Sequence, residues 1–256
     1  MTAFKKLAIA AMLGGASLAA HAATPLSASA SIDWSSFTVS IYDINPLDGE
    51  TPSVNFSDAS KWSGAYNFTN LSSVASSDYR SSWTPTPALS AISSFANGYA
   101  NAGNSDSSIS SNANMTAPLA DVWNINSYAS KSANFTINGM AAVVFSAHYS
   151  LIAHDDNLAD DNRANASVIF YSGLTESDGT QYGYSQTSAG ITDGSKSGTL
   201  RLAFVNTDGT PMHGYFGANA TAQVGASVAP VPEPSEYLMM LSGLGLVGFA
   251  VRRRKQ

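Results

Sequence analysis

Apolar and polar residues alternate in several short stretches of this chain, and this alternation is the feature that most limits its fold. Residues 37–42 read Phe-Thr-Val-Ser-Ile-Tyr, and comparable patches occur at residues 133–137, 167–171 and 199–205. Such a period of two is typical of a β-strand with one buried face. Ser, Thr and Asn make up 75 of the 256 residues, and they favour strands, turns and loops over helix interiors. We therefore expect an all-β protein, a β-sandwich of the jelly-roll type.

Turn residues divide these patches. Asn138-Gly139 separates the patch at residues 133–137 from an apolar stretch at residues 140–152. Because Asn-Gly readily takes the positive φ angles of a tight turn, this arrangement predicts a β-hairpin. Residues 81–118 lack the alternating pattern, since they contain Thr-Pro-Thr-Pro and then a run of almost only Asn, Ser, Gly, Ala and Asp. We expect a loop-rich segment there, with at most a short helix at residues 88–99.

The N-terminal 22 residues have the pattern of a secretory signal peptide. Lys5 and Lys6 precede an apolar stretch at residues 7–20, and Ala20-His21-Ala22 is a small-residue cleavage site. This order of charge, apolar segment and small residues predicts export by the Sec machinery and removal of residues 1–22.

The C-terminal end has a second processing pattern, in residues 230–256. Pro232, Glu233 and Pro234 cannot join a helix interior or a central strand, so this segment should be extended and exposed. The 15 apolar residues at 237–251 follow, and as a helix they span about 22 Å of the roughly 30 Å hydrocarbon core. The basic residues that come next place the C-terminus on the cytoplasmic side: Arg252, Arg253, Arg254 and Lys255. We expect a short transmembrane helix that is held only transiently.

This order of elements closely resembles the PEP-CTERM protein-sorting tail of Gram-negative bacteria, which is also called the ice-binding protein C-terminal domain. In that family the tail is the substrate of an exosortase, a membrane enzyme. The resemblance implies that Pro232, Glu233 and Pro234 are recognition residues. It also implies that the protein passes through the inner membrane and then reaches the cell surface or the extracellular space. The second name of the tail is not evidence for ice binding, because the chain has no array of Thr-x-Thr repeats.

The exported part, residues 23–229, is expected to form one domain. It has six basic and sixteen acidic residues, a formal net charge of −10. Nucleic acid and anionic lipid are poor partners for such a surface. The chain has no cysteine, which excludes thiol catalysis, cysteine zinc sites and iron–sulfur clusters.

The densest polar cluster lies in residues 154–162. Asp155, Asp156, Asp160 and Asp161 could supply oxygen ligands to Ca²⁺. The spacing is not that of an EF-hand, and a solvated loop explains the cluster equally well. His148, His154 and His213 are a second possible metal set, with a strand histidine and a loop histidine as the simpler interpretation.

The chain has no recognisable catalytic motif, so we do not expect an enzyme. Adjacent aspartates in one loop do not set up the paired carboxylates of a glycosidase. The four tryptophans, together with the eleven tyrosines, could stack on sugar rings or pack in the core. Trp34 should be core, whereas Trp62 and Trp83 lie in polar surroundings that favour exposure. We expect an exported structural or adhesive surface protein. The alternatives are a carbohydrate-binding module, with Ca²⁺ or without, and then a polysaccharide hydrolase.

Overall fold

The computed structural model describes residues 25–69, 73–80, 89–95, 98–115, 122–155, 163–175, 180–207 and 209–225. The expected signal peptide, the sorting tail and its transmembrane segment lie outside these residues. Within the described ranges, no helix is long and apolar enough to cross a membrane.

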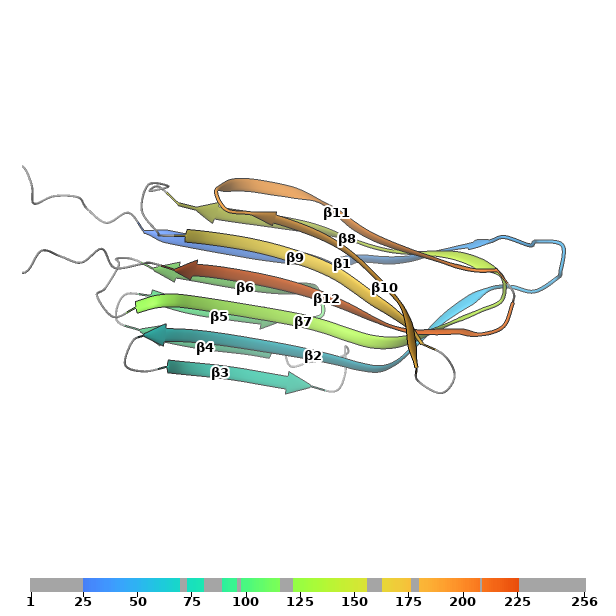
Figure 1. Ribbon diagram of the computed structural model, residues 1–256, viewed down its shortest axis with the longest axis horizontal. Helices are drawn as coiled ribbons and strands as arrows, with labels where there is room; N and C mark the ends of the chain where they lie inside the picture. The colour runs from blue at the N-terminus through green and yellow to red at the C-terminus, as the bar shows by residue number, and fades with distance from the viewer. Residues whose placement is uncertain are drawn as a thin grey trace, which may run out of the picture.

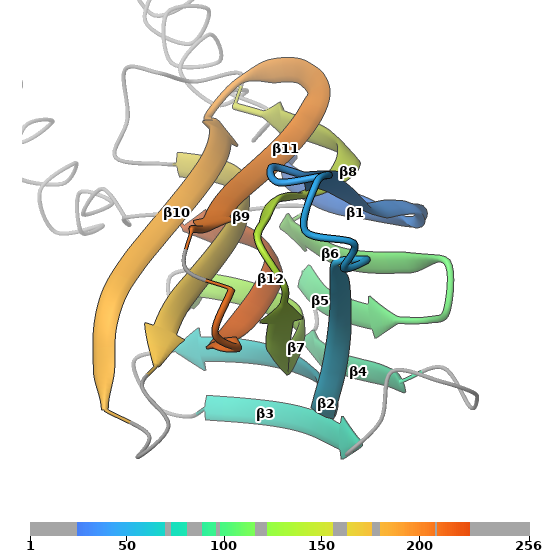
Figure 2. The same ribbon diagram turned by 90° about the vertical axis from the view of Figure 1, so that its right-hand side faces the viewer.

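The chain forms two antiparallel sheets of six strands each (Figure 1). We call them sheet one and sheet two, and Figure 2 shows them as two layers. In order across sheet one, the strands are β11 (Gly194–Asn206), β8 (Ala141–His154), β1 (Leu26–Asp43), β6 (Ser108–Met115), β5 (Gly98–Asn104) and β4 (Leu89–Phe95). In order across sheet two, they are β10 (Gln181–Ile191), β9 (Arg163–Thr175), β12 (Met212–Gly225), β7 (Val122–Asn138), β2 (Ser53–Thr69) and β3 (Ser73–Arg80).

The expected all-β sandwich is confirmed. A jelly roll has eight strands, and the described part of this chain has twelve, so the finer jelly-roll assignment stays a prediction. Consecutive strands often change sheet. β1 pairs with β8 in sheet one, whereas β2 pairs with β7 in sheet two. The connection from β1 to β2 therefore crosses from one layer to the other.

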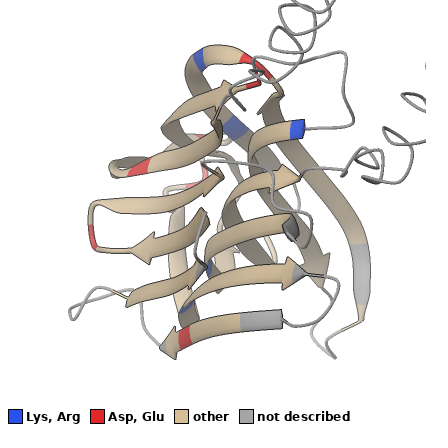
Figure 3. Cartoon of the chain, turned by 90° about the vertical axis from the view of Figure 1, so that its left-hand side faces the viewer, with Lys and Arg blue, Asp and Glu red and all other residues tan. Residues whose placement is uncertain are grey.

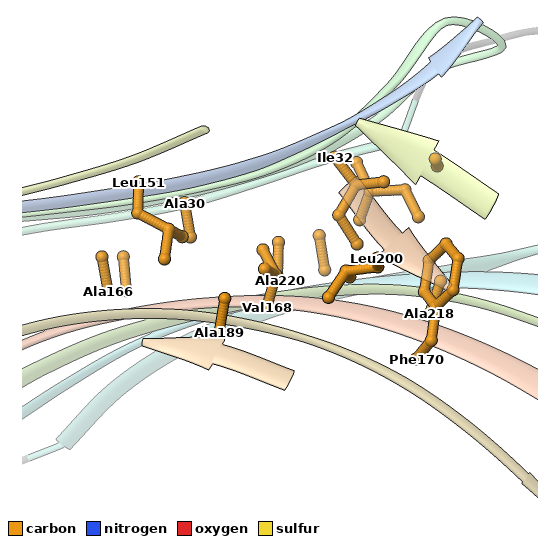
Figure 4. Close-up of a cluster of buried hydrophobic side chains, with 14 of the residues drawn as sticks. Ala30, Ile32, Leu151, Ala166, Val168, Phe170, Ala189, Leu200, Ala218 and Ala220 are labelled. Atoms are coloured by element: carbon orange, nitrogen blue, oxygen red, sulfur yellow. The ribbon is translucent and has the colours of Figure 1, made fainter. Parts of the chain in front are cut away.

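The core lies between the two inner faces, as the alternating pattern requires. Ala30, Ile32 and Leu151 of sheet one point toward Ala166 and Val168 of sheet two (Figure 4). A second group of buried side chains is aromatic, with ring centroids 5–7 Å apart in favourable tilted or edge-on geometry; it includes Phe135, Phe145, Phe170, Phe204 and Phe216. Burial of these apolar faces is the main stabilising term of the fold.

The prediction of a loop at residues 81–118 is wrong, because this segment contains three strands. β4, β5 and β6 form one side of sheet one, and the proposed short helix at residues 88–99 is replaced by β4 and the start of β5. The alternation is present but weak, because most inward residues of β5 and β6, apart from Ile109 and Met115, are small or polar. Ala100, Ala102 and Ala113 are buried, and Asn and Ser occupy most positions between them.

The prediction of a hairpin at Asn138-Gly139 is also wrong. The turn exists, and Gly139 has a φ of 76°, but β7 belongs to sheet two and β8 to sheet one. The chain crosses between the layers because Phe135 and Ile137 before the turn and Val143 and Phe145 after it are all buried in the shared core. A flat hairpin would not direct both sets of side chains into the same interior.

Asn206 holds this crossing turn in place. Its side-chain amide Nδ2 donates to the carbonyl oxygen of Gly139 at 2.9 Å and to that of Thr210 at 2.7 Å. Asn206 is itself buried. One amide group therefore fastens the β7–β8 turn to the β11–β12 turn.

Replacing this amide should destabilise the fold. Asn206→Ala leaves two carbonyl groups without their donor, which is expected to lower the free energy of unfolding by about 1–3 kcal/mol. The matched control is Asn55→Ala, at an exposed position of β2, which should change it by less than about 0.5 kcal/mol. Urea unfolding followed by circular dichroism measures both. Equal stability of the two variants would show that the amide does not hold the turns together.

Candidate functional site

The outer face of sheet two carries a group of aromatic side chains on neighbouring strands. Trp62, Tyr66 and Phe68 occupy alternate outward positions of β2, and Tyr128 projects from the adjacent strand β7. The ring centroid of Trp62 lies 4.9 Å from that of Tyr128 and 6.3 Å from that of Tyr66. Tyr66 and Phe68 are stacked, with centroids 6.2 Å apart. These four side chains are half-buried or exposed.

A second aromatic group lies on the same face, toward the opposite edge of the sheet. Tyr171 on β9 and Tyr215 on β12 have ring centroids 6.3 Å apart, and the exposed Tyr184 lies on β10. Burial, and then the neighbouring phenol groups of Tyr128, Tyr215 and Tyr184, raise the pKa of Tyr171 to about 12. The two groups therefore form one tyrosine-rich surface, which we call the aromatic face, defined by Trp62, Tyr66, Phe68, Tyr128, Tyr171, Tyr184 and Tyr215.

Glycines allow two of these rings to lie against the sheet. A Cβ atom on Gly64 would be 2.4 Å from Cη2 of Trp62, and a Cβ atom on Gly217 would be 2.1 Å from Cζ of Tyr171. No real side chain fits at such distances. The ring of Trp62 thus covers the backbone of its own strand, and the ring of Tyr171 covers the adjacent strand β12. Rings supported from below in this way lose rotational freedom and keep their other side toward solvent.

Uncharged polar groups lie between the aromatic groups. Ser130, Asn219 and Thr221 occupy outward positions on β7 and β12, and Gln223 donates to Asn124 at 3.2 Å. The side-chain oxygens of Asn126 and Asn219 have no hydrogen-bond partner. The face therefore combines apolar ring surfaces with amide and hydroxyl groups.

Sheet one lacks a comparable surface in its described part. Its exposed aromatic side chains are Tyr42, near the end of β1, and Tyr99 on β5. No ring contact joins them. The clustering on sheet two is therefore more than an effect of overall composition.

Charged residues are rare on the ribbon, as Figure 3 shows. Among the described outward positions of β2, β7, β12 and β9, two carry a charged residue. They are Asp58, at a bulge in β2, and Arg163, the first residue of β9. Asp58 accepts from the amide of Asn134 at 3.0 Å. The middle of the aromatic face is therefore uncharged.

Two lysines are instead buried on the inner face beneath it. Lys61 and Lys131 are directly opposite each other on β2 and β7, and they are 3% and 0% exposed. The ammonium group of Lys131 donates to the carbonyl of Ser105 at 2.8 Å and lies 4.7 Å from the ring centroid of Trp34. A cation over an aromatic face is attracted by the quadrupole of the ring. Trp34 is buried in the core, as expected from the sequence.

Of the proposed calcium ligands, the structure describes Asp155 alone; Asp156, Asp160 and Asp161 lie outside its described ranges. Asp155 is buried, and its carboxylate accepts from the backbone amide of Ala164 at 3.3 Å. This carboxylate therefore helps to close the loop between β8 and β9. Among the described residues, no three His, Asp or Glu side chains come close enough together to hold a metal ion. Calcium binding in this loop stays a prediction.

The three histidines are not brought together as a metal set. His148 on β8 bonds to Thr199 at 3.0 Å in sheet one, and His213 on β12 bonds to Thr136 at 3.0 Å in sheet two. Trp62 does lie on an outer face, whereas Trp83 is outside the described residues. Sequence reasoning named the tyrosines only as a group and selected none of them, although Trp62-x-x-x-Tyr66-x-Phe68 has the even spacing of one strand face.

Comparison with known proteins identifies the C-terminal segment. Residues 230–255 match the family model of the PEP-CTERM protein-sorting motif, which confirms the resemblance seen in the sequence. The motif implies an exported protein that an exosortase processes and that is sorted to the cell surface. The recognition role of Pro232, Glu233 and Pro234 and the stop role of Arg252–Lys255 stay predictions.

The remaining comparisons add little. No curated protein matches the chain. A solved structure of carbohydrate-binding modules from the β-sandwich superfamily aligns with 81% of this chain and 98% of its own, at 12% identity and a TM-score of 0.16. Similarity at this level carries no argument about fold or ligand.

The buried lysine pair should make stability depend on pH. Burial, followed by the like charge of Lys61, lowers the pKa of Lys131 from 10.5 to about 8, and Asp106 partly opposes this. Below pH ~8 the folded and unfolded chains both hold this proton, so the cost of the buried charge is fully present. Between pH ~8 and ~10 the unfolded chain binds more protons than the folded one, and stability should rise with pH. The expected gain is on the order of 1–3 kcal/mol.

Lys131→Met should remove this rise, because it keeps an apolar side chain and deletes the ammonium group. Thermal unfolding at a series of pH values below ~10 tests it, since the raised pKa of Tyr171 lowers stability only at higher pH. Lys196→Met, at an exposed position of β11, is the matched control and should keep the slope. An unchanged slope in Lys131→Met would contradict the assignment.

Proposed function

Because the chain carries a PEP-CTERM sorting motif and an uncharged aromatic face, we propose that it is an exported, non-enzymatic adhesive protein that binds polysaccharide at the cell surface or in the extracellular matrix. The observation that carries this proposal is the placement of Trp62 and Tyr171 over Gly64 and Gly217. Rings held against a sheet form a fixed apolar platform.

Sugar rings fit such a platform for a simple physical reason. Each pyranose ring has faces made of C–H groups and an edge of hydroxyl groups. The C–H faces can rest on the negative face of an aromatic ring. The hydroxyl groups can exchange hydrogen bonds with amide and hydroxyl side chains such as Asn126, Ser130 and Asn219. The aromatic face offers both kinds of contact on a rigid sheet.

Sorting and binding fit together in this proposal. The Sec machinery exports the chain, the segment at residues 237–251 holds it briefly in the inner membrane, and the exosortase cuts near Pro232-Glu233-Pro234. The sandwich then acts outside the cell, where polysaccharide is abundant. The absence of a recognised catalytic motif in the sequence favours binding over turnover.

Removing one platform ring should weaken polysaccharide binding. Trp62→Ala is expected to lower affinity about 10-fold, corresponding to the loss of about 1.4 kcal/mol of stacking. Affinity electrophoresis against a panel of soluble polysaccharides measures the change. Tyr99→Ala on the outer face of sheet one is the matched control and should bind as the unmodified protein does.

A second variant moves the ring without deleting it. Gly64→Ala places a methyl group where Cη2 of Trp62 now lies, so the ring must leave its position. Binding should fall by a similar factor, while the melting temperature changes by only a few degrees. Retained binding in both variants, with the fold intact, would contradict a role for the aromatic face.

The sorting part is tested by mass and fractionation of the native protein. The mature species should lack residues 1–22 and the segment after about Pro234, and it should be found outside the cell. In cells without the exosortase, the basic residues Arg252 to Lys255 should remain on a membrane-bound species. A protein that keeps its C-terminus in the inner membrane whether or not the enzyme is present would show that the tail is an ordinary anchor.

A further inference from the structure

Extending the proposed function, we infer that the ligand of the aromatic face is an extended, uncharged glycan chain that runs across the strands of sheet two. The inference rests on the proposed polysaccharide binding. It adds the direction, the minimum length and the charge class of the ligand. Register, distance and charge on this one face support it.

The register places the two aromatic groups far apart across the sheet. Trp62 is opposite Ser130, Ser130 is opposite Asn219, and Asn219 is opposite Ile169. Tyr171 lies two residues from Ile169 on the same strand. Trp62 and Tyr171 are thus separated by three strand spacings, about 14 Å, and by about 7 Å along the strands. The line that joins the Cα atoms of Trp62 and Tyr171 runs mainly across the strands.

This separation sets a minimum length. One sugar ring can cover one aromatic ring, so a monosaccharide cannot rest on both Trp62 and Tyr171. A longer chain can rest on Trp62 and Tyr128 at one end and on Tyr171 and Tyr215 at the other. Its middle then passes over the outward positions of Ser130 and Asn219.

The middle of the aromatic face offers no charged partner to an ionic glycan. Lys61 and Lys131, the lysines nearest to this face, are directed into the core and are almost fully buried. An acidic polysaccharide would therefore meet no cationic partner in the middle of the face and would be repelled by a body of net charge −10. A polyamine glycan would find no carboxylate in the middle of the face. Asp58 lies away from it, at the bulge in β2, and accepts a hydrogen bond from Asn134. An uncharged glycan has no ionic group that would need a partner on such a surface.

The experiment compares length and charge on the full-length protein. The neutral probes are cello-oligosaccharides of increasing length together with soluble galactomannan and β-glucan. Alginate and polygalacturonate are the acidic probes, and chitosan oligosaccharides are the basic ones. We expect binding to at least one neutral glycan, with affinity rising about 10-fold or more once the chain is long enough to reach both groups. Trp62→Ala and Tyr171→Ala should each reduce the affinity of long chains to that of short ones.

The possible results separate the two levels of the proposal. Tighter binding of an acidic or basic glycan, or equal affinity for the shortest and the longest neutral chains, would overturn the inference and leave polysaccharide binding intact. Failure of every glycan to bind would remove the proposed function itself. Tyr99→Ala again serves as the control, because it deletes an exposed tyrosine of the other sheet and should change none of these affinities.

Discussion

The burial of two alternating faces against each other is the constraint on which the rest of this structure depends. Each strand commits every second residue to the interior, where phenylalanine rings and alanines fill the space between the sheets. Stability is therefore supplied by the inner faces, and the outer faces are free to carry other chemistry. The aromatic face uses this freedom, because Trp62 and Tyr171 rest on the outside of a sheet whose inside is already packed. Glycine at positions 64 and 217 weakens the strands slightly and makes room for the rings.

The sequence allowed the fold class to be predicted, and the reasons for its failures are specific. Alternation at residues 37–42 and 199–205 was strong enough to identify β1 and β11. At residues 98–115 it was hidden, because the inward positions hold polar residues such as Asn104 and Ser111 as well as alanines. Asn138-Gly139 predicted a turn correctly and its partner strands incorrectly, since a dipeptide does not encode which sheet the chain enters next. The aromatic face could not be foreseen, because it requires the register of five strands.

The positions of the buried lysines could not be predicted from the sequence either. Six basic residues in the exported part suggested sparse surface charges, yet Lys61 and Lys131 lie together in the interior. The partners of Lys131 are the carbonyl of Ser105 and the ring of Trp34, groups that are distant in sequence. This arrangement removes positive charge from the surface and leaves the middle of the aromatic face without cations. A residue count thus gave the correct net charge, but it suggested surface positions for two lysines that are buried.

The position of β12 has a consequence for the order of events during export. β12 lies between β7 and β9 in the middle of sheet two, and it is the last strand described before the sorting motif at residues 230–255. Sheet two cannot be completed until nearly the whole chain has crossed the membrane. Non-local pairing of this kind folds slowly. In the proposed export route, a tail held in the membrane would keep each molecule tethered and separate while its last strand inserts.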